Sequence, residues 1–218
     1  MPRAVGAALL VLVVVVGTAP TPAAGGEPPF DGRIAPIGDR LAERMRGVSW
    51  RPGCPVPLRD LRVLAFGYLG YDGASHRGRL VVHEDAAGDV LRVFRRAYRA
   101  GFPFARVRLP ERWDADDRRL MRANVTSAFN CRHVAGTTRW SMHAYGLAID
   151  INPVQNPFVD GEHVTPRRGQ RFADRSLRHP GMLRPRGVVV RAFRRIGWGW
   201  GGDRTSVKDY MHVSSNGR

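Results

Sequence analysis

From residue 141 to residue 150 the chain reads Ser141-Met142-His143-Ala144-Tyr145-Gly146-Leu147-Ala148-Ile149-Asp150. Apolar residues alternate through the second half of this run and on to Asn152, which predicts a strand over 147–152. Leu147, Ile149 and Ile151 are expected to face the core. Asp150 would then lie on the opposite, exposed face, where a rigid strand holds its carboxylate in place.

A second run near the end of the chain complements the first. It reads Asp209-Tyr210-Met211-His212 and adds an imidazole and a carboxylate. Two histidines and one carboxylate, with one position left to water, are the ligands of many catalytic zinc sites. His143, Asp150 and His212 are therefore candidate metal ligands, although spacing alone also allows polar residues that bind no metal. Asp209 is a candidate general base, although spacing alone also allows a turn residue, since neighbours on one strand face lie two apart.

The rest of the chain mixes helical and extended patterns without regular alternation. Periodicity predicts helices over 36–46, 85–100, 114–124 and 188–196, and strands over 61–69, 80–83, 105–109 and 210–213. Residues 127–132 are expected to be extended, and 153–186 to form a long surface loop. This order predicts an α+β fold with a mainly antiparallel central sheet and flanking helices.

The first residues are typical of export. An arginine, an apolar run over 4–16 and small residues up to Ala24 predict a secretory signal peptide over 1–24. A loose leader over 25–33 and one catalytic domain over 34–218 would follow. The apolar run is too short to span a membrane, so no stable membrane anchor is expected after cleavage. The protein is predicted to be secreted, cell-wall associated and monomeric.

Charge and cysteines limit the partners and the compartment. The formal net charge is +16, carried almost wholly by arginine, which favours a polyanionic partner such as an anionic cell wall. A GC-rich genome would produce the same composition. Nucleic acid is not expected, because no binding module is recognisable. Cys54 and Cys131 are the only cysteines and are predicted to form a disulfide in an oxidising compartment.

The two runs resemble one known family. Residues 141–150 resemble the Ser-x-His-x-x-Gly-x-Ala-x-Asp signature of the D-alanyl-D-alanine carboxypeptidase family of zinc peptidases, which includes VanY-type carboxypeptidases and L-alanyl-D-glutamate endopeptidases. Residues 200–203 and Asp209-x-x-His212 resemble the second half of its site. The resemblance spans about 126–215 and is nearest to secreted actinobacterial members.

The resemblance implies a role for each matching residue. His143, Asp150 and His212 would bind Zn²⁺, and Asp209 would be the general base. Arg132 matches an arginine that steadies the substrate carbonyl or the oxyanion; one more surface arginine is the alternative. Ser141 would either orient His143 or contact the substrate. Trp200 is a candidate substrate contact, although tryptophans here equally suit core packing. The chain departs from the family at two positions, Arg204 and Val213, where many members have aromatic residues.

Together these features predict a secreted zinc peptidase that acts on peptidoglycan stem peptides. Carboxypeptidase, dipeptidase and endopeptidase actions share these ligands, so the scissile bond stays open. The alternative is a non-catalytic zinc-containing module that binds the cell wall. Asp209 argues against that alternative, because a purely structural metal site needs no such base.

Overall fold

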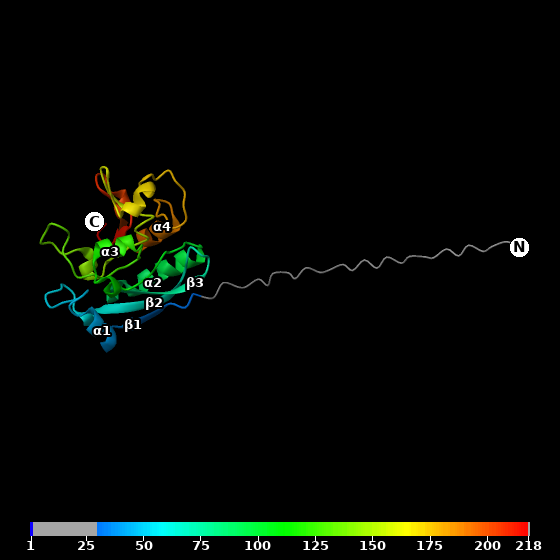
Figure 1. The fold of residues 1–218 in the computed structure, drawn as a ribbon. Coiled ribbons are helices and arrows are strands. Elements are labelled where there is room, and N and C mark those ends of the chain that lie inside the picture. Colours follow the sequence, from blue (N-terminus) through cyan, green and yellow to red (C-terminus); the bar gives the residue numbers. More distant parts are fainter. Residues whose placement is uncertain (2–29, 218) are drawn as a thin grey trace.

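A computed structural model describes Met1 and residues 30–217 (Figure 1). The signal peptide expected over 1–24 and most of the expected leader lie outside these residues. The described strands form three small antiparallel sheets accompanied by helices, which confirms the α+β class and the antiparallel pairing. Within the described part, no helix has the length and hydropathy required to cross a membrane.

The first sheet has the order β1-β2-β3, with β1 at Arg33–Pro36, β2 at Leu61–Leu69 and β3 at Ser75–His83. Strand β2 has the predicted bounds, whereas β3 begins five residues earlier than expected. The first helix is shorter than predicted: α1 is Asp39–Met45, and Pro36 ends β1 instead of starting a helix. Proline suits this place because β1 is an edge strand, where no ladder hydrogen bond is lost.

Helix α2, Glu84–Arg99, holds the largest core together. Its apolar stripe packs on β2 and β3 on one side and on α4, Val188–Arg195, on the other (Figure 1). The first and last residues of both helices lie within one residue of the bounds predicted from the sequence. Phe30, at the described end of the expected loose leader, already packs on this core, with its ring 6.1 Å from that of Phe66.

Two short sheets at the other end of the chain build the candidate site. One has the order β4-β9-β7, from Ala148–Asp150, His212–Ser214 and Gly199–Trp200. The other has the order β6-β5-β8, from His163–Thr165, Phe158–Asp160 and Lys208–Asp209. The predicted strand over 210–213 is thus a turn at Tyr210 and Met211 followed by β9, so Asp209 and His212 belong to different sheets.

Three other expectations need correction. The segment 105–109 forms no strand and makes only an isolated bridge from Val107 to Thr126. Helix α3 is Asp117–Arg122, capped by Asp116, because Asp114 has a positive φ of 55° at the end of the 3-10 helix η2, Pro110–Trp113. The expected loop 153–186 contains β5, β6 and the 3-10 helix η4, Arg167–Ala173. The remaining 3-10 helices are η1 at Leu58–Asp60, η3 at Met142–Tyr145 and η5 at Gly201–Asp203.

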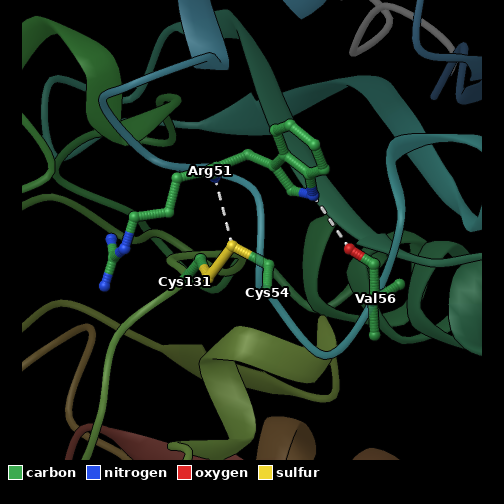
Figure 2. Close-up of a disulfide and its surroundings, with 5 residues drawn as sticks. Arg51, Cys54, Val56 and Cys131 are labelled. Carbon is green, nitrogen blue, oxygen red and sulfur yellow. Dashed lines mark hydrogen bonds between the residues drawn. A yellow bond between two sulfur atoms is a disulfide. The ribbon is translucent and has the colours of Figure 1, made fainter.

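The predicted disulfide between Cys54 and Cys131 is present and closes a separation of 77 residues (Figure 2). The backbone N–H of Arg51 donates to the Cys54 sulfur, and the neighbouring Trp50 indole donates to the Val56 carbonyl at 2.9 Å. The bond ties the loop before β2 to the residue that precedes Arg132. A disulfide of this kind is typical of proteins outside the cytoplasm.

Candidate metal centre

His143 is fixed by its own short helix. Ser141 caps η3, since its hydroxyl accepts the His143 backbone N–H at 3.3 Å, and Gly146 ends the helix with φ at +68°. A Cβ at Gly146 would lie 2.5 Å from the backbone nitrogen of His83, so the turn lies directly against β3. The glycine of the signature is therefore required both by its backbone conformation and by this close approach.

The other two candidate ligands are cross-strand neighbours. Asp150 is the last residue of β4, and His212 is the first residue of β9; the antiparallel register places them directly opposite each other. Side chains of such a pair lie within contact distance. The pairing of β4 with β9 therefore brings together two residues that are 62 positions apart in sequence.

The ligand atoms of these three residues converge. His143 Nε2 lies 3.3 Å from His212 Nδ1 and 3.3 Å from Asp150 Oδ2, and His212 Nδ1 lies 3.2 Å from Asp150 Oδ1. One atom from each residue falls within 4.8 Å of the others, which makes the trio a candidate metal site.

Hydrogen bonding around His143 prepares it to bind a metal. Its Nδ1 lies 2.6 Å from the carbonyl oxygen of Ala128. A carbonyl can only accept, so Nδ1 donates its N–H to Ala128, and Nε2 is the ring nitrogen that faces the site. Metal-ligating histidines are typically oriented by such a partner on the other ring nitrogen. The donor set of two imidazoles and one carboxylate thus fits Zn²⁺.

Burial and neighbouring charges act in opposite directions on these groups. Burial alone would raise the pKa of Asp150, but the charge of His143 and hydrogen bonds from both histidines hold that pKa well below its usual range. Burial alone would lower the pKa of His212, yet the hydrogen bond and charge of Asp150 raise it. The carboxylate of Asp150 therefore stabilises a positive charge among these three side chains, whether a proton or a metal ion carries that charge.

Asp209 lies in the same pocket but is not one of the three clustered residues. Its side chain is 19% exposed, and the nearest described cation is Arg204, whose Nη1 lies 4.0 Å from Oδ2. Oδ1 is buried without a hydrogen-bond partner among the described residues. Burial accordingly raises the pKa of Asp209. A carboxylate with a raised pKa and an unused oxygen atom is suited to accept a proton.

A cavity of about 570 Å³ surrounds these groups. It contains His143, Asp150, His212 and Asp209, and also Arg132 and Ser141. The predicted metal ligands, base and arginine thus line one pocket. Arg132 forms an ion pair with Asp117, and its Nη1 donates to the His133 carbonyl at 3.3 Å, which fixes the guanidinium at the pocket wall.

Two expectations about the site surroundings do not match the structure. Trp200 is not among the pocket-lining residues; it is 3% exposed in the core, where its indole donates to the Tyr210 carbonyl at 2.8 Å. Asn152 was expected on an exposed face with Asp150, but it is buried and bonds to the Pro103 and Gly181 carbonyls. The expected strand over 147–152 is only β4, Ala148–Asp150, and Asn152 follows it with a positive φ of 44°, so strand alternation no longer sets the direction of its side chain.

The pocket also contains residues that the sequence patterns did not single out. Trp140, Tyr145, Phe158 and Arg139 line it, and so does Arg204, which was noticed only as a departure from the family. Arg139, Trp140 and Tyr145 lie next to or within the signature run, whereas Phe158 comes from β5 and Arg204 follows η5, so no single local spacing connects all five. Their aromatic rings and guanidinium groups are the contacts available to a bound peptide.

The comparisons with known proteins agree with this geometry. The model of the D-alanyl-D-alanine carboxypeptidase family, a family of zinc peptidases, matches residues 135–215. The matched stretch includes the three candidate ligands and Asp209, and Arg132 lies just before it. Searches of curated proteins and of solved structures found no match to the chain.

Proposed function

We propose that the protein is a secreted zinc peptidase that hydrolyses peptide bonds in peptidoglycan stem peptides. The observation that carries the proposal is the convergence of His143, Asp150 and His212 in one pocket with the half-buried carboxylate of Asp209. A structural metal site is normally closed by a fourth protein ligand, whereas this trio leaves a position open. The match to a carboxypeptidase family supports a peptide substrate.

The protein's own groups divide the chemical work. When bound, Zn²⁺ supplies a Lewis acid that polarises a carbonyl and lowers the pKa of water. Asp209 takes the proton of the attacking water and returns it to the leaving amine, so one carboxylate serves as base and then as acid. Its raised pKa makes Asp209 a stronger base than an exposed aspartate, so it accepts the proton of the water more readily.

Arg132 stabilises the charge that develops during attack. Its ion pair with Asp117 holds the guanidinium at the pocket wall before substrate arrives. Donors fixed in advance near a developing oxyanion are a major source of catalysis in acyl transfer. Ser141 acts indirectly, because its hydroxyl is used to cap the helix that carries His143.

The second candidate function is a zinc-containing module that binds the cell wall without cutting it. The strongly basic composition is compatible with such a role. The buried, unbonded oxygen of Asp209 favours the enzyme, because a module without chemistry gains nothing from the desolvation of that carboxylate.

The test is hydrolysis of defined wall fragments. Zinc-loaded protein recovered from the culture medium is incubated with purified muropeptides, and the products are identified by mass spectrometry. We expect either loss of one terminal D-alanine or a single cut within the stem peptide. Products of neither kind, from protein that contains zinc, would favour the binding module.

A matched pair of histidine variants ties the activity to the site. His143→Ala removes a candidate ligand, whereas His163→Ala removes an exposed histidine of β6 whose ring forms a hydrogen bond with Thr165 outside the pocket. The first variant should lose zinc and hydrolysis, and the second should keep both. Hydrolysis that survives His143→Ala would place the activity elsewhere in the chain.

A further inference from the structure

A second pocket lies apart from the metal centre and shares no lining residue with it. Its volume is about 710 Å³. The walls come from the end of β2, the β2–β3 turn, β3 and the segment 105–113, with Ala123 and Arg168 at one side. Four arginines and three aromatic side chains line it: Arg106, Arg108, Arg112, Arg168, Tyr68, Tyr71 and Trp113.

Backbone carbonyls hold three of the arginines in place. The Nη1 of Arg106 donates to the Ala123 carbonyl at 2.6 Å, and that of Arg168 donates to the Arg122 carbonyl at 3.1 Å. Arg108 donates from Nη1 to two carbonyls, at 2.7 and 2.9 Å. None of the three forms an ion pair with a described carboxylate, so each guanidinium is positioned while its charge stays uncompensated.

The pocket therefore contains hydrogen-bond donors without partners, and these donors belong to positively charged groups. The Nη2 and Nε groups of these arginines have no partner among residues 30–217. The single carboxylate in the lining, Asp72, is already bonded to His76, with 2.9 Å between Oδ2 and Nε2. Guanidinium forks that are fixed in advance match the oxygen atoms of phosphate and carboxylate groups.

Aromatic rings accompany the charges. Trp113 is half-buried, with the Arg112 guanidinium 5.8 Å from its ring centroid, and Tyr71 is exposed. Such side chains offer a flat apolar face together with a polar edge, which suits ring-shaped polar ligands. A simple counter-ion would need only the arginines, so the combination points to a ligand with both an anionic group and a ring.

We propose that this pocket binds an anionic sugar polymer. Its phosphate or carboxylate groups would lie on Arg106, Arg108 and Arg168, and a sugar ring would pack against Trp113. The disulfide places the chain in an oxidising compartment, which favours a polymer of the cell surface over a nucleic acid. The site would hold the protein on the wall and needs neither the metal nor Asp209.

Calorimetric titration of the zinc-loaded protein tests the ligand chemistry. The probes are a glycerol phosphate polymer, polygalacturonate, neutral dextran and single-stranded DNA, all at one ionic strength. We expect binding to one or both anionic sugar polymers and none to dextran. Binding to phosphate alone or to carboxylate alone identifies the anion. Dextran binding equal to that of the charged polymers, or tighter binding of DNA than of either, would overturn the proposal.

Two double variants separate the pocket from general surface charge. Arg106→Gln with Arg168→Gln removes two lining charges, whereas Arg118→Gln with Arg178→Gln removes two exposed charges outside it. The first pair should weaken polymer binding at least about tenfold, since each charge-assisted bond contributes substantially. The second pair should have a much smaller effect. Equal weakening by the two pairs, with unchanged thermal unfolding, would mean that diffuse charge accounts for binding.

A third variant tests the ring contact. Trp113→Ala should weaken binding of the sugar polymer but leave the binding of inorganic phosphate, titrated separately as a probe without a ring, unchanged. An unchanged polymer affinity in this variant would remove the sugar from the proposal.

Discussion

Replacing Asp209 by asparagine separates catalysis from metal binding. The substitution keeps the shape of the side chain and removes its ability to take a proton. Loss of a general base typically reduces rate by about 10²–10⁴-fold, equivalent to about 3–5 kcal/mol of transition-state stabilisation. We expect the upper part of this range, because Asp150 is the other carboxylate lining the pocket and is occupied with both histidines.

The same change should leave fold and zinc intact. Burial raises the pKa of Asp209, so the folded state disfavours its ionised form, and a neutral amide relieves that penalty. The midpoint of thermal unfolding should therefore be no lower than in the wild type. Asp160→Asn in β5 is the matched control, since Asp160 is exposed and lies in the same sheet as Asp209.

The assay compares kcat and KM on a purified stem peptide with zinc content measured on the same samples. A fall in kcat at full zinc occupancy and nearly constant KM is the expected outcome. An Asp209→Asn variant as active as Asp160→Asn would refute the assignment of the base. A variant that loses its zinc would instead make Asp209 a ligand.

Four further outcomes follow from the structure. One zinc per chain is expected, and His143→Ala should bring occupancy close to zero by elemental analysis, as each imidazole is one of three ligands. Because the pKa of His212 is raised, protons compete with zinc from a higher pH than for an ordinary histidine, and zinc affinity in a chelator titration should fall about tenfold per pH unit below that pKa. Replacing Cys54 and Cys131 together by serine should lower the free energy of unfolding by about 4 kcal/mol in denaturant titrations, since the bond closes a loop of 77 residues. Gly146→Ala should destabilise by about 1–3 kcal/mol and reduce zinc affinity, because it strains a positive φ and places a Cβ 2.5 Å from a backbone nitrogen of β3.

The elements most visible in the sequence are those that pack along one continuous stripe or strand. Helix α2, helix α4 and strand β2 match their predicted bounds closely, because the period of apolar residues directly reflects burial of one face. The predicted bounds are less accurate for elements whose ends depend on caps and turns. Pro36 and Asp114 suit helix starts in isolation, yet pairing with β2 and a left-handed turn determine their conformations.

The sequence by itself determined which side chains are available for chemistry. The signature residues 141–150 and the pair Asp209 and His212 indicated the candidate metal ligands and the candidate base, because the family signature consists of particular side chains and a turn glycine at fixed spacing. The disulfide could also be predicted from the sequence, because Cys54 and Cys131 are the only two cysteines in the chain.

Tertiary structure alone decided how these groups meet. The register of β4 on β9 puts Asp150 opposite His212, and the turn before β9 moves Asp209 into another sheet that still reaches the same pocket. Trp200 lies in the core, whereas Trp140 and Phe158 line the pocket. Strand pairing and burial depend on contacts between segments far apart in the chain, and local periodicity contains no information about which segment will cover a given face.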